Sequence, residues 1–453
     1  MTTPLSPHTP TPPPSSGTSA SHSSGSASGS TGGLLRELGK WDLTAIGVNQ
    51  VIGGAVFLMP ALLASQIGAW SAIAVALVGV LALLIALNFA EAGSRFDGTG
   101  GAYLYTRAAF GRFVSFEVGW MLWVTRVTSW ASVVNGLTDA LGYYWPELRA
   151  DQPGMAREMV ITTVILSIMS INVRGIKQSA WVVNTLTVGK LTPLLIFIVI
   201  GLPYVSFDAL RPEVALTWSQ ISTSALYLIF AYGGYEVVGV PAGEARDPKR
   251  AVPFAMVTTI IIVAIVMTLV QVVAMGTLPN LAVARTPLAD ASLLFLGVWG
   301  ALLMTSGGAI SMTGNNVGQA LSGSRNLYAL SEQGDLPSFF GRVHPRFHTP
   351  AVAIVITSLV ALVLALSGNF ATLAASSAVS RLMVYAGTCA SVLALRRQGP
   401  ASFTIPGGPV VPILALAVCV AILFGATPLQ REVGGIALVV GAALYWTARW
   451  RNK

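Results

Sequence analysis

The sequence predicts an all-α membrane protein of about twelve spanning helices. Of its 453 residues, 54% are hydrophobic and only 10% are charged, whereas a soluble domain carries about a quarter charged residues. Apolar runs of roughly twenty residues, long enough to cross the hydrocarbon core as helices, recur from Trp41 to Trp446 with short polar gaps between them. Lipid is therefore the predicted solvent of most of the surface.

The chain opens with a segment of different composition. Residues 1–33 consist almost entirely of Pro, Ser, Thr, Gly and Ala, with too few apolar side chains to offset the entropy lost on ordering. We predict a disordered cytoplasmic tail there. The segment lacks the basic start and short apolar core of a secretory signal, so the first spanning helix is expected to direct insertion.

The remaining chain divides into a first five-helix repeat at 34–205, a second, inverted five-helix repeat at 206–397, and two extra helices with the C-terminus at 398–453. The spans are predicted near 41–67, 71–94, 113–145, 157–173, 181–203, 218–241, 251–275, 290–329, 350–367, 369–395, 408–424 and 431–448.

The basic residues predict the orientation. With the N-terminus inside, the inner loops and tails hold eighteen of the 26 Lys and Arg residues and the outer loops hold five. We therefore expect a multi-pass protein of the cell membrane with both termini cytoplasmic, and no nucleic-acid partner despite the net charge of +8. Cys389 and Cys419 lie inside apolar runs and the four histidines are scattered, so no metal site is predicted.

Two spans are interrupted by small residues. The first carries Gly53, Gly54 and Ala55 near its middle, and the sixth carries Gly233 and Gly234 at a corresponding place. A single glycine pair most often marks close helix packing. Breaks in the first helix of each five-helix half instead indicate an inverted-repeat transporter with a central site, and because five is odd the second half is inverted.

Paired broken helices suit a zwitterionic ligand. One half-helix offers backbone N–H groups to a carboxylate and the other offers carbonyls to an ammonium group, although such a cradle also accepts other small polar solutes. Phe230, just before the second break, would cover the ligand as a gate or serve only as packing. The predicted substrate-binding residues are Val51, Ile52, Gly53, Gly54, Ala55, Phe230, Ala231, Gly233 and Gly234.

Four longer motifs carry a family resemblance, namely VIGGAVFLMP, AEAGSRFDGTGGAYLYTRAAFG, FAYGGYEVVGVPAGEARDPKRAVP and SRNLYALSEQGDLPSFFGRVHPRFHTPAVA. Over roughly residues 34–450 the chain resembles the amino acid-polyamine-organocation permeases. The resemblance implies a leucine-transporter-like fold and alternating access around a central site. Family members commonly show Gly-Ser-Gly or Gly-Ala-Gly at the first break, so this chain lacks the serine hydroxyl and depends there on backbone N–H groups.

Lys190 lies within the fifth predicted span, where a basic side chain costs about 2.5 to 3.5 kcal/mol unless it is paired or reaches water. It either snorkels to the headgroups or takes part in coupling. Coupling is possible because burial disfavours the charged form of an amine, so that a buried amine gives up its proton more readily than an exposed one. Proton-coupled relatives have a fifth-helix lysine in a similar place, whereas sodium-coupled relatives use eighth-helix hydroxyls, for which Ser311 and Thr313 are the candidates. We favour a proton as the coupling ion and expect no cofactor.

Other charges also fall inside the predicted spans. Glu236 follows the second break and is either a proton relay or an acceptor for exposed N–H groups. Arg126 is a candidate for the translocation path. Interhelical pairing, or a position that faces a water-filled cavity, is the simpler interpretation for it and for Arg381, Glu117 and Asp139.

These features predict a secondary active transporter of amino acids that is coupled to protons, with the lipid bilayer and a small amino acid or amine as its partners. An amino acid/amine (polyamine) exchanger and a non-transporting nutrient sensor of the same fold are the alternatives. An enzyme is not expected, because no nucleophile–base pair or set of metal ligands stands out. The side-chain preference and the oligomeric state stay open.

Overall fold

The computed structural model describes residues 37–451, except 99, 153, 176–179 and 213. The predicted disordered tail at 1–33 therefore lies outside the described residues. In the part that is described, regular secondary structure is helical apart from one isolated bridge between Leu38 and Ala245. The predicted all-α class is confirmed.

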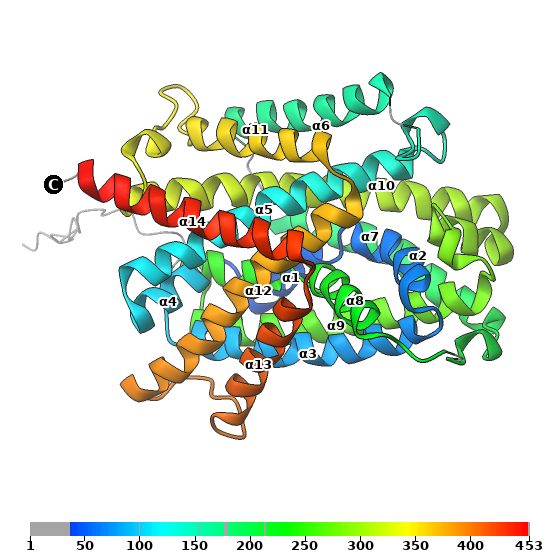
Figure 1. Ribbon diagram of the computed structural model, residues 1–453, viewed down its shortest axis with the longest axis horizontal. Helices are drawn as coiled ribbons and strands as arrows, with labels where there is room; N and C mark the ends of the chain where they lie inside the picture. The colour runs from blue at the N-terminus through cyan, green and yellow to red at the C-terminus, as the bar shows by residue number, and fades with distance from the viewer. Residues whose placement is uncertain (1–36, 99, 153, 176–179, 213, 452–453) are drawn as a thin grey trace, which may run out of the picture. The chain divides into compact units, whose positions relative to one another are not determined.

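Each predicted span corresponds to one helix or to a pair of helices (Figure 1). In chain order these are α1 (Lys40–Val51) with α2 (Ala55–Ile67), α3 (Trp70–Gly93), α5 (Arg112–Leu141), α6 (Met155–Arg174), α7 (Ala180–Gly201), α8 (Trp218–Ala231) with the 3-10 helix η4 (Tyr235–Glu244), α9 (Pro248–Thr277), α10 (Pro287–Glu332), α11 (Ala351–Ser367), α12 (Phe370–Leu395), α13 (Val410–Gly425) and α14 (Pro428–Arg451). The short helix α4 (Ala102–Phe110) lies in the connection between α3 and α5.

Length and composition alone identify fewer spans. Among the described residues, eight helices are long and apolar enough to cross a membrane, or nine if α1 and α2 count as one bent span. Helix α5 is not one of them: it is less apolar than these helices and carries Arg112, Glu117, Arg126 and Asp139. It packs against α10, α11, α12 and α14. Most of its surface therefore faces protein, which can pair these charges, and not lipid.

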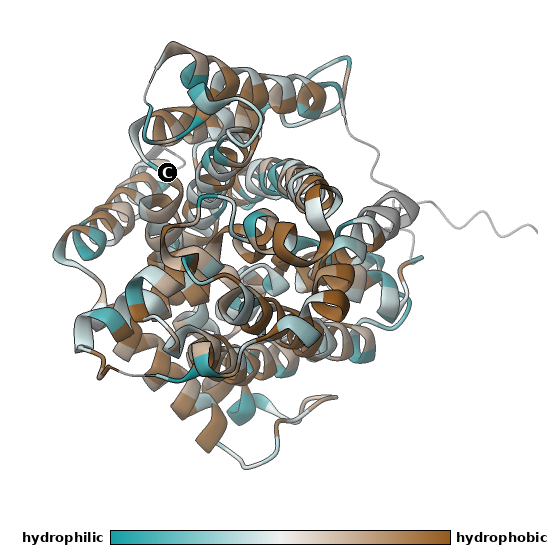
Figure 2. Ribbon diagram, turned by 90° about the vertical axis from the view of Figure 1, so that its right-hand side faces the viewer, coloured by the Kyte–Doolittle hydropathy of each residue, from teal (hydrophilic) through white to brown (hydrophobic). Residues whose placement is uncertain are grey.

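The outward faces of the other helices are apolar. Leu77, Val199, Val363 and Val439 have 58–70% of their surface exposed. Figure 2 shows apolar residues distributed along the helices. So many large apolar side chains on the surface indicate a lipid environment.

The packing pairs corresponding helices of the two predicted halves. Helix α3 lies along α9, and α5 lies along α10, so the second and third helices of one half contact their counterparts in the other (Figure 1). The broken first helices also meet, α1 against η4 and α2 against α8. Two inverted five-helix repeats would produce this pairing. The repeat boundaries at 205/206 and 397/398 remain predictions.

Candidate functional site

The first break separates two half-helices. Helix α1 ends at Val51, α2 begins at Ala55, and their axes differ by 44°. Gly53 and Gly54 between them are buried. The first N–H groups of α2 have no partner within that helix, and the last carbonyls of α1 must likewise be satisfied from outside it. The break thus presents donors and acceptors side by side.

Lys190 on α7 satisfies two of those carbonyls. Its Nζ donates to the carbonyl oxygens of Asn49 and Ile52, at 2.9 Å each. The side chain is 1% exposed, so the snorkelling interpretation is wrong. Among the described residues no carboxylate lies within ion-pair distance of Lys190, and its charge is held by the negative end of α1.

Helix α10 supplies the remaining contacts to this break. Ser311 Oγ lies 3.2 Å from the carbonyl oxygens of both Ile52 and Gly53, and Asn315 Nδ2 donates to Gln50 O at 2.8 Å. Thr313, the second hydroxyl proposed for a sodium site, is exposed and donates to Ala309 O on its own helix. Of the two candidate hydroxyls, therefore, only Ser311 reaches the break.

The second break lies directly against the first. Helix α8 ends at Ala231, and Gly234 has φ 132°, a backbone conformation that favours glycine. A β-carbon added to Gly234 would lie 3.0 Å from the backbone carbon and oxygen of Gln50 and 3.1 Å from the nitrogen of Val51. Only the absence of a side chain lets the two backbones approach so closely.

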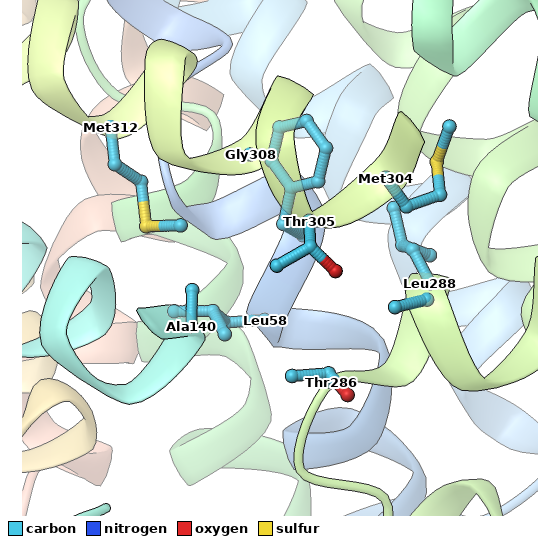
Figure 3. Close-up of a pocket in the computed structure, with 10 residues that line it drawn as sticks. Leu58, Ala140, Thr286, Leu288, Met304, Thr305, Gly308 and Met312 are labelled. Atoms are coloured by element: carbon cyan, nitrogen blue, oxygen red, sulfur yellow. The ribbon is translucent and has the colours of Figure 1, made fainter. Parts of the chain in front are cut away.

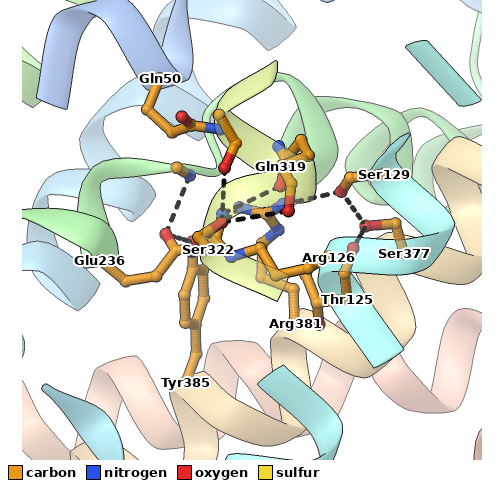
Figure 4. Close-up of polar contacts among 12 residues, drawn as sticks. Gln50, Thr125, Arg126, Ser129, Glu236, Gln319, Ser322, Ser377, Arg381 and Tyr385 are labelled. Carbon is orange, nitrogen blue, oxygen red and sulfur yellow. Dashed lines mark hydrogen bonds and ion pairs between the residues drawn. The ribbon is translucent and has the colours of Figure 1, made fainter. Parts of the chain in front are cut away.

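Glu236 is the centre of a buried polar cluster immediately after the second break. Figure 4 shows Arg126 from α5 and Arg381 from α12 pointing toward its carboxylate. Arg126 Nη2 lies 3.1 Å and Arg381 Nη1 2.9 Å from Glu236 Oε1. The other oxygen accepts from Gly234 N at 2.8 Å and from the Tyr385 hydroxyl at 3.1 Å. Glu236 therefore accepts a hydrogen bond from an N–H group that the break leaves without a helical partner. This is one of its two predicted roles.

The predicted binding residues share this place in the fold. Val51, Ile52, Gly53, Gly54 and Ala55 are all buried at the first break, as are Phe230, Ala231, Gly233 and Gly234 at the second. The ring of Phe230 packs edge-on against Phe370, with 6.0 Å between centroids. The structure brings these residues together, and their contact with a substrate stays a prediction.

A small, mostly apolar cavity of about 20 Å³ lies near the first break (Figure 3). Phe57 and Leu58 of α2, Ala140 of α5, and Met304 and Met312 of α10 contribute to its lining. Met312 also borders the break, because a β-carbon added to Gly54 would lie 3.0 Å from Met312 Cγ. The cavity therefore lies beside the first turn of α2.

Sequence analysis missed the amide side chains of the site. Gln50, Asn315 and Gln319 are all buried, and Gln319 Oε1 accepts from Arg126 Nη1 at 3.2 Å. Their signal was available, since amides inside apolar spans are costly unless they are bonded. Arg381 and Asp139 both form interhelical pairs, Arg381 with Glu236 at 2.9 Å and Asp139 with Arg157 at 2.7 Å. Neither carboxylate oxygen of Glu117 has a hydrogen-bond partner among the described residues.

Comparison with known proteins finds relatives that match most of the chain. A family model described as amino acid permease matches residues 38–445. The chain is 27% identical to a methylthioribose transporter of Bacillus subtilis, over 93% of this chain and 95% of that protein. It is 25% identical to a branched-chain amino acid permease of the same organism, over 91% and 93%, and 28% identical to its serine/threonine exchanger, over 91% and 95%. These relatives are named as transporters that differ in what they carry.

Proposed function

The chain belongs to the amino acid permease family, and from that premise we propose that it carries amino acids across the cytoplasmic membrane by alternating access, in symport with protons. The position of Lys190 is the observation on which the coupling rests. Its Nζ sits on two carbonyls of the broken first helix, in the place where a bound cation would neutralise them.

Proton loss at Lys190 would weaken the hold of α7 on this break. The ammonium group offers three donors and a full charge to the carbonyls of Asn49 and Ile52, whereas the neutral amine offers two donors and no charge. Because α1 and η4 are in contact at the paired breaks, a movement of α1 also displaces η4. Protonation is thereby linked to the state of the substrate site.

The cavity supports a carrier with an apolar contact surface for its substrate. It lies beside the first turn of α2, and the N–H groups that begin this helix have no side-chain cap and suit a carboxylate. An amino acid bound there by its carboxylate would direct its ammonium group to the carbonyl end of α8, next to Phe230.

Uptake by purified protein in liposomes tests the proposal. A panel of labelled amino acids is offered with and without an inward proton gradient. We expect gradient-driven accumulation of at least one of them. In the Lys190→Ala variant uptake should lose its dependence on pH. Lys249→Ala, which removes a lysine at the start of α9 that pairs with Asp97 at 3.2 Å, should keep it. Unchanged pH dependence in Lys190→Ala would rule out the coupling role.

An exchanger is the second candidate, because one relative is named a serine/threonine exchanger. Its signature in the same liposomes is uptake that requires preloaded amino acid or amine and ignores the proton gradient. Binding to the purified protein without any flux would instead identify a sensor of the same fold.

The proposed orientation has both termini in the cytoplasm, supported by the excess of Lys and Arg in one set of loops. Both native cysteines, Cys389 and Cys419, are buried, so introduced thiols can be labelled selectively. A membrane-impermeant thiol reagent added to whole cells should label Glu147→Cys and spare Arg342→Cys, both at exposed positions. The reverse pattern would invert the topology.

A further inference from the structure

The cluster around Glu236 contains more positive than negative charge. Arg126 and Arg381 both contact its single carboxylate, and the side chains of all three are 1–2% exposed. Among the described residues, Glu236 is the only carboxylate within ion-pair distance of either guanidinium. One positive charge is left without a counter-charge in a buried place, which is unfavourable for the protein on its own.

The two arginines also have unused hydrogen-bond donors. Nε of Arg126 and Nε of Arg381 are buried and have no hydrogen-bond partner in the described part of the chain. A buried donor without an acceptor costs about 1 to 3 kcal/mol, and more when the group is charged. Surplus positive charge together with unused donors points to a missing anionic acceptor.

The position of the cluster identifies where that acceptor comes from. The guanidinium of Arg381 lies against the backbone of Gly233, inside the second break. Arg126 is joined through Gln319 to α10, and Asn315 one turn earlier on α10 holds the first break. A ligand held between the breaks therefore has both arginines within reach of a second polar group.

The α-carboxylate already has a place in the proposed mode of binding. The N–H groups that begin α2 have no side-chain cap and are available to it at the first break. The surplus charge is thus free for a different group of the same ligand.

Building on the proposed transport of amino acids, we propose that the substrate bears a second anionic group, as acidic amino acids do, and that Arg126 and Arg381 determine this specificity by binding it. Glu236 holds the two guanidiniums in place and leaves the net charge of one that the side-chain carboxylate neutralises. A lysine-like substrate is disfavoured, because its cationic side chain would meet the same surplus positive charge.

Matched ligand pairs test the proposal. Binding of L-glutamate and L-glutamine, and of L-aspartate and L-asparagine, is measured on the full-length purified protein by ligand-induced shifts in melting temperature. The members of each pair have nearly the same shape and differ in charge. We expect the acid to bind at least about tenfold more tightly than its amide, a difference of about 1.4 kcal/mol.

Variants separate specificity from stability. In Arg126→Gln and Arg381→Gln the cluster becomes neutral, so the preference for the acid should vanish, while Arg381→Lys should keep part of it. The control Arg325→Gln removes an exposed arginine of α10 and should leave the acid-to-amide ratio unchanged. Arginines that only tie helices together would lower the melting temperature without ligand and leave that ratio intact in the folded fraction, which would overturn the proposal.

The remaining outcomes also decide the question. If the amides, or neutral amino acids in general, bind as tightly as the acids and are transported, the proposed function stands and the acidic substrate is wrong. If no amino acid binds or is transported, the proposed function itself fails, and the substrate proposal falls with it.

Discussion

Arg381 and Gly233 occupy adjoining space at the second break, so closely that a β-carbon on the glycine would overlap the guanidinium. The absence of a side chain at position 233 therefore makes room for Arg381. This relationship fixes Arg381 beside the place where a substrate would be held.

Gly233→Ala should consequently displace Arg381 from Glu236. Overpacking of this kind costs about 1 to 3 kcal/mol, and we expect the affinity for the transported amino acid to fall about tenfold or more. Gly314→Ala is the matched control, since a β-carbon there meets no atom within 4 Å. Equal affinities in the two variants would show that the contact with Arg381 has no role in binding.

Uptake should not require sodium. The carbonyls of Asn49, Ile52 and Gly53 that could ligate Na⁺ accept hydrogen bonds from Lys190 or Ser311. Replacing Na⁺ by choline at constant pH should leave the initial rate of uptake in liposomes unchanged. A rate that rises with Na⁺ concentration would mean that Lys190 leaves these carbonyls during the cycle.

Phe230→Ala should weaken retention of the substrate. The ring is buried at the end of α8 and packs on Phe370, and its loss opens the second break toward α12. We expect an affinity about tenfold lower, mainly through faster release. Dissociation of labelled substrate measures this directly, and an unaltered rate would leave Phe230 as a packing residue only.

Asp335 joins α4 to the end of α10 outside the spans. It is buried and accepts from the Tyr103 hydroxyl at 2.8 Å and from Arg112 Nε at 2.6 Å. Burial, reinforced by the charge of Asp335, raises the pKa of Tyr103 to about 12, so this tyrosine stays a donor at physiological pH.

Asp335→Ala should therefore lower the stability by about 1 to 3 kcal/mol, since the Tyr103 hydroxyl loses its acceptor. The melting temperature of the purified protein reports the change. In the Tyr103→Phe background the same substitution should cost less, because the tyrosine donor is already gone. Equal losses in the two backgrounds would show that the Tyr103 contact contributes nothing.

Much of the fold followed from local patterns. Apolar run length predicted the helices, and paired small residues located both breaks, because glycine in mid-span is a strong local signal. The cost of a charge inside a span points to Lys190, which the structure places at the first break. Its partners could not be predicted in the same way. They are backbone carbonyls of another helix, and the sequence does not determine which side of that helix faces Lys190.

The cluster at Glu236 is the clearest case of contacts that could not be predicted from the sequence. Arg126 and Arg381 lie 110 and 145 residues from Glu236 along the chain, and neither has a charged residue among its neighbours in the sequence. Amphipathic periodicity, the usual guide to facing, fades in helices that are apolar all round. The prediction that Thr313 reaches the first break is wrong for this reason. Thr313 is two residues from Ser311 and lies on an exposed face of α10, whereas Ser311 faces the break.

The polar composition of α5 has a consequence for biogenesis. Arg126 enters the membrane before Glu236, 110 residues later, has been synthesised. At a synthesis rate of roughly 5 to 20 residues per second, its guanidinium waits on the order of ten seconds for its counter-charge. We therefore expect α5 to remain near the insertion machinery until α8 and η4 emerge, so that the order of translation sets the order in which the core of the carrier assembles.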